Sequence, residues 1–158
     1  MVDFYHVCFA VADIEHAMHD FTQAAGTEWN PVRDETLGEW TYRIVFSRSV
    51  PHIELIQGPP GSPWDCTDGP RFDHLGWWTE SLEASSRRLA SQGLPADFDG
   101  CPYGRPFAYH RVDSIGARFE IVDASAQPGF LDNWNPGGSP MPALERQPDA
   151  MNTDETRG

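Results

Sequence analysis

Two histidines and two glutamates stand at matching places in this chain, and together these residue types could bind a divalent metal ion. His6 lies in FYHVCFAVADIEHA, and His74 lies in FDHLGWW about 68 residues later. Glu54 lies in HIELIQ, and Glu120 lies in ARFEIVD. Two imidazoles and two carboxylates suit Zn, Fe, Ni, Co or Mn and leave coordination positions for water or substrate. The pattern predicts a metal site built from these four residues.

The four residues belong to a weak internal repeat. Phe4 aligns with Phe72, and Ile14 aligns with Leu82. The block ends YRIVFSRSVPHIELI and YHRVDSIGARFEIV also align, with a shift of a residue or two. If the two copies pack about a pseudo-two-fold axis, both histidines and both glutamates meet in one cleft. A single histidine in a strand is more often a core or surface residue, so the prediction depends on the repetition.

The first copy is expected to fold as a strand, a helix and three strands. Phe4–Val11 is apolar and β-rich, which predicts a buried strand. Asp13 is a good N-cap for a helix that ends at Ala25 before Gly26. The rest is predicted as a short strand, a turn and a β-hairpin, over Thr27–Val32, Arg33–Gly38, and Glu39–Ser47 with Pro51–Gln57.

The second copy follows the same order. Phe72–Thr79 is its first strand, and Ser81 caps a helix from Leu82 to about Gln92. Residues 95–106 are expected to be loop with one short strand, and Phe107–Val112 and Ala117–Asp123 form its hairpin.

These elements predict an α+β fold of two βαβββ modules that pair into a partly open barrel with a cleft. The boundaries are residues 1–57 for the first module, 58–71 for a linker and 72–126 for the second module. Residues 127–158 form a C-terminal extension, partly disordered, because Asn135–Gly158 is rich in Pro, Gly, Asn and Asp. Phe130, Leu131 and Trp134 are the residues of this extension that can dock on the body.

Composition excludes several classes of function. The net charge of −13 argues against nucleic acid and anionic membranes as partners, so a small molecule is the expected partner. The chain has no Lys, which excludes Schiff-base chemistry and a P-loop lysine. Three widely spaced Cys, and an N-terminal segment without the features of a signal peptide, favour a cytoplasmic location.

At these motifs the chain resembles the vicinal oxygen chelate superfamily, which includes glyoxalase I, methylmalonyl-CoA epimerase, extradiol dioxygenases and antibiotic resistance proteins. The resemblance covers about residues 3–123 and rests on four segments in order, FYHVCFAVADIEHA, HIELIQ, FDHLGWW and ARFEIVD. The family's metal ligands carry over to His6, Glu54, His74 and Glu120. The turn DSIGA and the missing Lys depart from the family's patterns, and they leave the substrate open.

The complete ligand set, as in the isomerase and epimerase branches, implies a divalent-metal-dependent isomerase, epimerase or lyase. A bound ion would act as a Lewis acid on a carbonyl, while Glu54 or Glu120 takes the neighbouring proton, with a slight preference for Glu120. One alternative is a protein that sequesters an aromatic small molecule without reaction. Another is an Fe(II)-dependent oxygenase, although that branch uses two His and one Glu.

Aromatic side chains are plentiful, with six Trp, nine Phe and four Tyr. They favour an apolar or aromatic substrate, and an Arg on the middle strands could pair with a substrate carboxylate. The candidate substrate-binding residues are Trp40, Tyr42, Arg43, Trp78, Phe107, Tyr109 and Arg111. His52 is expected beside the site rather than as a ligand, and His110 is equally consistent with the cleft or the surface.

Related proteins commonly form dimers, and in a homodimer the two half-sites could come from different chains. His6 and Glu54 of one subunit would then face His74 and Glu120 of the other. The sequence does not distinguish this arrangement from a site within one chain.

Overall fold

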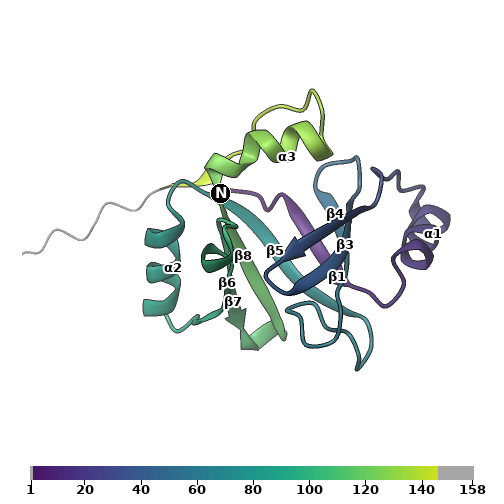
Figure 1. The fold of residues 1–158 in the computed structure, drawn as a ribbon. Coiled ribbons are helices and arrows are strands. Elements are labelled where there is room, and N and C mark those ends of the chain that lie inside the picture. Colours follow the sequence, from purple (N-terminus) through teal and green to yellow (C-terminus); the bar gives the residue numbers. More distant parts are fainter. Residues whose placement is uncertain (1, 146–158) are drawn as a thin grey trace, which may run out of the picture.

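The computed structural model describes residues 2–145, and within them one strongly curled, nine-stranded sheet forms the body of the molecule (Figure 1). The first half contains β1 His6–Ala10, α1 Ile14–Ala25, β2 Arg33–Leu37, β3 Trp40–Phe46 and β4 His52–Gln57. The second half contains β5 Arg71–Thr79, α2 Leu82–Ser91, β6 Ala96–Asp99, β7 Phe107–Val112 and β8 Ala117–Asp123. After it come α3 Gln127–Trp134 and β9 Ala143–Leu144. The predicted α+β fold with two βαβββ units is confirmed.

The strand order explains how the two halves meet. The path is β2-β3-β4-β1-β5-β8-β7-β6, so each half contributes a matching set of four strands. β1 pairs in parallel with β4, and β5 pairs in parallel with β8. The halves join through the antiparallel pair β1 and β5, in which His6 lies opposite Gly76. The first strands of both copies therefore lie side by side at the centre of the sheet.

Alternation along the strands gives the sheet two different faces. On β1, Cys8 and Ala10 belong to a core cluster with Tyr42, Ile56 and Tyr109 inside the curl of the sheet. The neighbouring Phe9 packs instead with the apolar side of α1, in the cluster of Val11, Ile14, Val45 and Leu55. The outer face thus packs on α1, while the inner face carries a core cluster of its own and His6.

Helices α1 and α2 begin where the sequence predicts and end within about one residue of the predicted positions. The Asp13 side chain accepts a hydrogen bond from the His16 N–H, and Gly26 ends α1 in the left-handed conformation at φ 65°. The Ser81 side chain accepts from the Ala84 N–H at the start of α2.

The prediction for the segment after α1 was wrong. Arg33–Leu37, interpreted as a turn, is strand β2, and Thr27–Val32 makes only an isolated bridge between Trp29 and Ser47. β2 lies at the edge of the sheet, and its exposed positions carry Asp34 and Thr36, which gave it the polar composition of a turn.

The C-terminal extension adds structure that the repeat did not predict. Residues 127–134 form α3, which lies across the open side of the curled sheet (Figure 1). Residues 143–144 then pair with the end of β5 as β9, so this part of Asn135–Gly158 is ordered against the body. The expected disorder of residues 146–158 falls outside the described residues. Within residues 2–145, no helix has the length and apolarity needed to cross a membrane.

Candidate metal centre and its pocket

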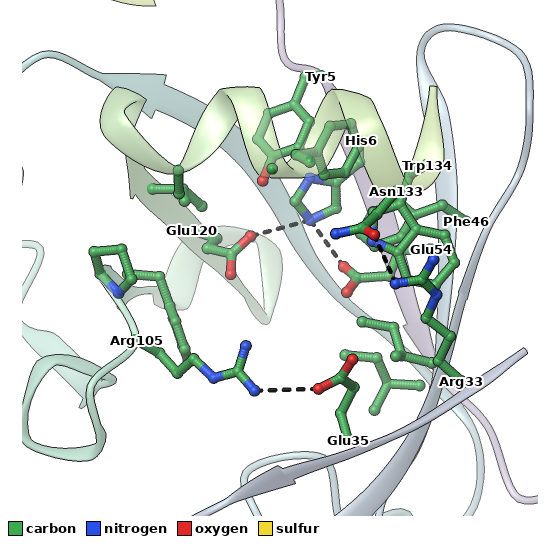
Figure 2. Close-up of a pocket in the computed structure, with 18 of the residues that line it drawn as sticks. Tyr5, His6, Arg33, Glu35, Phe46, Glu54, Arg105, Glu120, Asn133 and Trp134 are labelled. Atoms are coloured by element: carbon green, nitrogen blue, oxygen red, sulfur yellow. Dashed lines mark hydrogen bonds and ion pairs between the residues drawn. The ribbon is translucent and has the colours of Figure 1, made fainter. Parts of the chain in front are cut away.

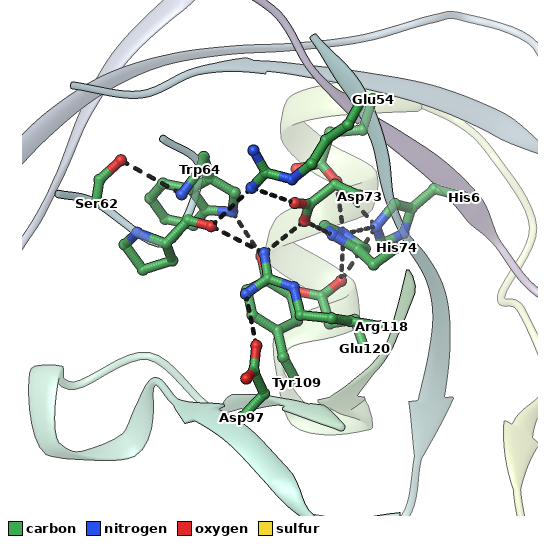
Figure 3. Close-up of polar contacts among 12 residues, drawn as sticks. His6, Glu54, Ser62, Trp64, Asp73, His74, Asp97, Tyr109, Arg118 and Glu120 are labelled. Carbon is green, nitrogen blue, oxygen red and sulfur yellow. Dashed lines mark hydrogen bonds and ion pairs between the residues drawn. The ribbon is translucent and has the colours of Figure 1, made fainter. Parts of the chain in front are cut away.

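His6, Glu54, His74 and Glu120 converge in one buried cluster within a single chain (Figure 3). The Nε2 atoms of the two histidines lie 2.9 Å apart. Glu54 Oε2 lies 2.9 Å from His6 Nε2 and 3.2 Å from His74 Nε2. Glu120 Oε2 lies 3.1 Å and 3.4 Å from the same two atoms. One chain thus brings all four side chains together, so a second subunit is not needed to complete the cluster.

The spacing of these atoms fits a metal ion. Ligand atoms about 2.1 Å from one ion lie about 3.0 Å apart at right angles and about 3.4 Å apart in a tetrahedron. The contacts between imidazole nitrogens and carboxylate oxygens, at 2.9 to 3.4 Å, fall in that range. Glu54 Oε2 is buried and makes no well-aligned hydrogen bond with any described residue, as expected for an atom that faces a cation.

The charges of the cluster also fit a cation. Burial alone would raise the pKa of the Glu54 and Glu120 carboxyls, but the two imidazoles hold both below their usual value. Burial opposes protonation of His6, yet Glu54 and Glu120 raise the pKa of this imidazole. The cluster thus contains two carboxylates that require positive charge, and a divalent ion would supply it.

A second set of residues orients His74 (Figure 3). His74 Nδ1 lies 2.7 Å from Asp73 Oδ2, so in the neutral ring Nδ1 carries the proton and Nε2 presents its lone pair to the cluster. Asp73 in turn accepts hydrogen bonds from Arg118 at 2.6 Å and Arg71 at 2.9 Å. Burial would raise the pKa of Asp73, but His74 and Arg118 lower it to about 2. Hydrogen bonding of this kind behind a histidine is common in metal sites.

His6 is positioned by packing instead. A Cβ added at Gly76, opposite His6 on β5, would lie 2.0 Å from His6 Cε1. Only glycine leaves room for the ring there. His6 Nδ1 is buried without a hydrogen-bond partner among the described residues.

A cavity of about 350 Å³ opens beside the cluster (Figure 2). Its walls include His6, Glu54 and Glu120, so both glutamates border the space where a substrate would lie. The wall is largely aromatic, with Tyr5, Phe46, Trp78, Phe107, Phe130 and Trp134. Phe130 and Trp134 come from α3, which therefore closes one side of the cavity.

Four of the seven candidate substrate-binding residues line this cavity, namely Tyr42, Trp78, Phe107 and Tyr109. The structure does not bring Arg43, Arg111 and Trp40 to it. Arg43 follows Tyr42 on β3 and therefore points outward, where it pairs with Glu15. Arg111 is likewise at the surface and lies 3.3 Å from Asp113. Trp40 packs against Phe98 and Tyr103 away from the cavity.

The two other histidines considered for the site, His52 and His110, lie outside the cluster. His52 is fully buried, its Nδ1 lies 2.7 Å from the Ser47 carbonyl oxygen, and its ring packs near Phe130. His110 lies between Ser86 Oγ, at 2.8 Å, and the Leu94 carbonyl oxygen, at 2.7 Å, and is not part of the cavity wall.

Sequence reasoning missed several residues of the site. Arg33 and Glu35 line the cavity from β2, and alternation would have found them if that segment had been predicted as a strand. Arg105 and Asn133 carry no local signal, because they come from a loop and from α3.

Comparison with known proteins assigns the family. A family model described as the glyoxalase/bleomycin resistance protein/dioxygenase superfamily matches residues 5–109. The chain belongs to this superfamily. The βαβββ units and the pairing of β1 with β5 are thus its vicinal oxygen chelate fold.

Solved structures of similar fold include two epimerases and a synthase. Methylmalonyl-CoA epimerase from Mycobacterium tuberculosis is 23% identical with a TM-score of 0.57, over 76% of this chain and 86% of that one. A Streptomyces coelicolor methylmalonyl-CoA epimerase in complex with 2-nitronate-propionyl-CoA is 13% identical with a TM-score of 0.59, over 78% and 97%. A mutant of 4-hydroxymandelate synthase from Streptomyces coelicolor is 15% identical with a TM-score of 0.55, over 76% and 47%. At these sequence identities the similarity shows a shared fold alone. No curated protein matches the chain.

Proposed function

We propose that this protein is a divalent-metal-dependent enzyme that moves a proton next to a carbonyl group, as an isomerase, epimerase or lyase. The observation that carries the proposal is the buried set of two His and two Glu at the edge of an aromatic cavity. The superfamily includes metal-dependent enzymes, and two of the similar structures are epimerases by name.

His6, Glu54, His74 and Glu120 would hold the ion, whose identity among Zn, Fe, Ni, Co and Mn stays open. A bound divalent ion supplies a Lewis acid that polarises a substrate carbonyl. Asp73 keeps the His74 ring in the orientation that this role requires.

Glu120 is the proposed base. Its side chain is 11% exposed, compared with 6% for Glu54, and both border the cavity. His74 and His6 lower the pKa of Glu120 against the effect of burial and keep its carboxylate ionised. In the proposed reaction this carboxylate accepts a proton from the carbon beside the carbonyl and returns it. The aromatic wall favours a flat, apolar substrate body.

The first test measures metal content by mass spectrometry on protein purified without a histidine tag. We expect about one equivalent of a transition metal per chain in the wild type, and loss of that metal in the His6→Ala and Glu120→Ala variants. His16→Ala and Glu83→Ala are matched controls, because both residues are exposed on helices. Retention of metal by both site variants would contradict the proposal.

The second test detects the proton transfer. Metal-loaded protein in D₂O is incubated with aromatic and aliphatic carbonyl compounds, and ¹H NMR follows loss of the signal at the carbon next to the carbonyl. We expect exchange with wild type and loss of at least about 100-fold in the rate with Glu120→Gln. Equal rates in the two proteins would exclude Glu120 as the base.

Sequestration of an aromatic molecule is a second candidate, favoured by the aromatic wall of the cavity. Tight binding by metal-free protein, with no exchange and no product, would select it over the enzyme.

A further inference from the structure

An ion pair spans the cavity between the two halves of the molecule (Figure 2). Arg105, in the loop between β6 and β7, donates from Nη2 to Glu35 Oε2 on β2 at 3.2 Å. The same nitrogen lies 3.4 Å from the Thr36 carbonyl oxygen. Both side chains line the cavity and are partly exposed, at 44% for Arg105 and 33% for Glu35. An ion pair this accessible to water is weak, and a competing anion can replace one partner.

Arg105 differs in this respect from Arg33, the other cation that lines the cavity among the described residues. Arg33 donates from Nη1 to Asn133 Oδ1 at 2.9 Å, and its guanidinium lies 4.7 Å from the centre of the Trp134 ring. Arg33 therefore attaches α3 to the sheet. Among residues 2–145, Arg105 has one charged partner, Glu35, and the carboxylate of a ligand can take its place.

The surroundings limit where an anionic ligand could place its charge. The chain carries a net charge of −13, and Glu54, Glu120 and Glu35 all line this cavity. Of the two arginines that line the cavity, Arg33 is engaged with α3, so a ligand carboxylate would find its positive partner at Arg105. The Trp78 side chain lines the same cavity and is 2% exposed. The aromatic wall between these groups suits a flat ring.

We propose that Arg105 is the specificity residue for a substrate carboxylate, and that the substrate is a small aromatic carbonyl compound with that carboxylate at the end remote from the reacting carbonyl. The ligand carboxylate replaces Glu35 on Arg105 and forms a charge-assisted, bidentate contact. The inference rests on the proposed function for the reacting carbonyl, but the anion contact is tested independently of it.

The test compares two acids with their neutral amides. The probes are 4-acetylbenzoate against 4-acetylbenzamide, and 4-acetylphenylacetate against its amide, titrated into the full chain by calorimetry. The variants are Arg105→Gln and Glu35→Gln. The matched controls are Arg111→Gln and Asp34→Asn, which remove the same charges from the outer surface.

We expect at least one acid to bind the wild type about 10-fold or more tightly than its amide does. Arg105→Gln should lower the affinity for the acid about 10-fold to 100-fold and leave the affinity for the amide unchanged. Glu35→Gln should raise the affinity for the acid about 2-fold to 5-fold, because it removes the carboxylate that competes for Arg105. The controls should change neither affinity. Equal affinities for acid and amide, or equal effects of Arg105→Gln and Arg111→Gln, would overturn the proposal.

Two measurements keep the outcomes separate. The midpoint of thermal unfolding identifies a variant that fails to fold. If Arg105→Gln fails to fold, Glu35→Gln still tests whether the ligand carboxylate replaces Glu35 on Arg105. Metal content on the same samples separates the proposals. Acid selectivity without bound metal would support the role of Arg105 and refute the metal-dependent enzyme. Bound metal without acid selectivity would support the metal-dependent enzyme and refute the role of Arg105.

Discussion

At the scale of single residues, Gly76 controls the position of His6. Replacement by alanine would place a methyl group 2.0 Å from the His6 ring, so the ring must turn away from the cluster. We expect Gly76→Ala to weaken metal affinity at least about 10-fold, as loss of a supporting contact does in other metal sites. Competition with a chelator measures this affinity.

Gly129→Ala is the control for this prediction, since a Cβ at Gly129 in α3 meets nothing within 4 Å. If the two variants bind metal with the same affinity, then Gly76 does not determine the position of His6.

At the scale of elements, Asp65 organises the crossover that carries Trp64 into the core. Its carboxylate accepts hydrogen bonds from the Gly61 N–H at 2.7 Å, the Thr67 N–H at 2.8 Å and the Thr67 hydroxyl at 2.5 Å. These bonds to Gly61 and Thr67 lower the pKa of Asp65 from 3.8 to about 2. A carboxyl whose pKa is lower in the folded than in the unfolded protein stabilises the fold at pH values above its unfolded pKa. That stabilisation is lost as the pH falls from about 4 to about 2.

We therefore expect Asp65→Asn to lower the free energy of unfolding at pH 6, and the difference from wild type to shrink toward pH 2. Urea denaturation at both pH values measures it. Asp68→Asn removes a charge from the same crossover and should give no such trend. A difference for Asp65→Asn that is independent of pH would contradict the assignment.

Helix α3 shapes the cavity through Phe130. The ring centre of Phe130 lies 5.2 Å from Tyr5, 5.0 Å from Phe46 and 5.6 Å from Trp78. We expect Phe130→Ala to weaken the binding of 4-acetylbenzoate about 10-fold, because the ligand ring loses one wall. Leu131→Ala, on the same helix but outside this cavity, should leave the affinity unchanged. Equal losses in both variants would show that α3 acts only through stability.

The elements also explain which features sequence reasoning could reach. His6 and His74 were predictable because they lie on strands with a clear apolar pattern, in a repeat that matches them. β2 was missed because an edge strand can carry charges on both faces, so its composition resembles that of a turn. The pairing of Arg105 with Glu35 joins residues 70 positions apart, and no local pattern encodes such a contact. The contribution of α3 was hidden for the same reason, since the repeat ends before it.

At the scale of the whole molecule, the four candidate metal ligands all come from one chain. We therefore expect that no residue of a second chain contributes to the metal site. A mixture of His6→Ala and His74→Ala chains, refolded together, should therefore bind no more metal than either variant alone. If the site lay between subunits, mixed dimers would contain some complete sites and would regain metal. Metal content after gel filtration distinguishes the two results, with refolded wild type as the control for recovery.

The symmetry of the sheet extends to the cluster but stops at the cavity wall. Each half supplies one His and one Glu from corresponding strands, whereas Arg33 and Glu35 from β2, Arg105 from a loop and Phe130 from α3 have no symmetric counterparts around the cavity. A duplicated unit can divide labour in this way. The paired ligands preserve one chemistry, while each copy is free to diverge at its own wall. New substrates can then arise through β2, the loop and α3, while the residues that bind the ion stay unchanged.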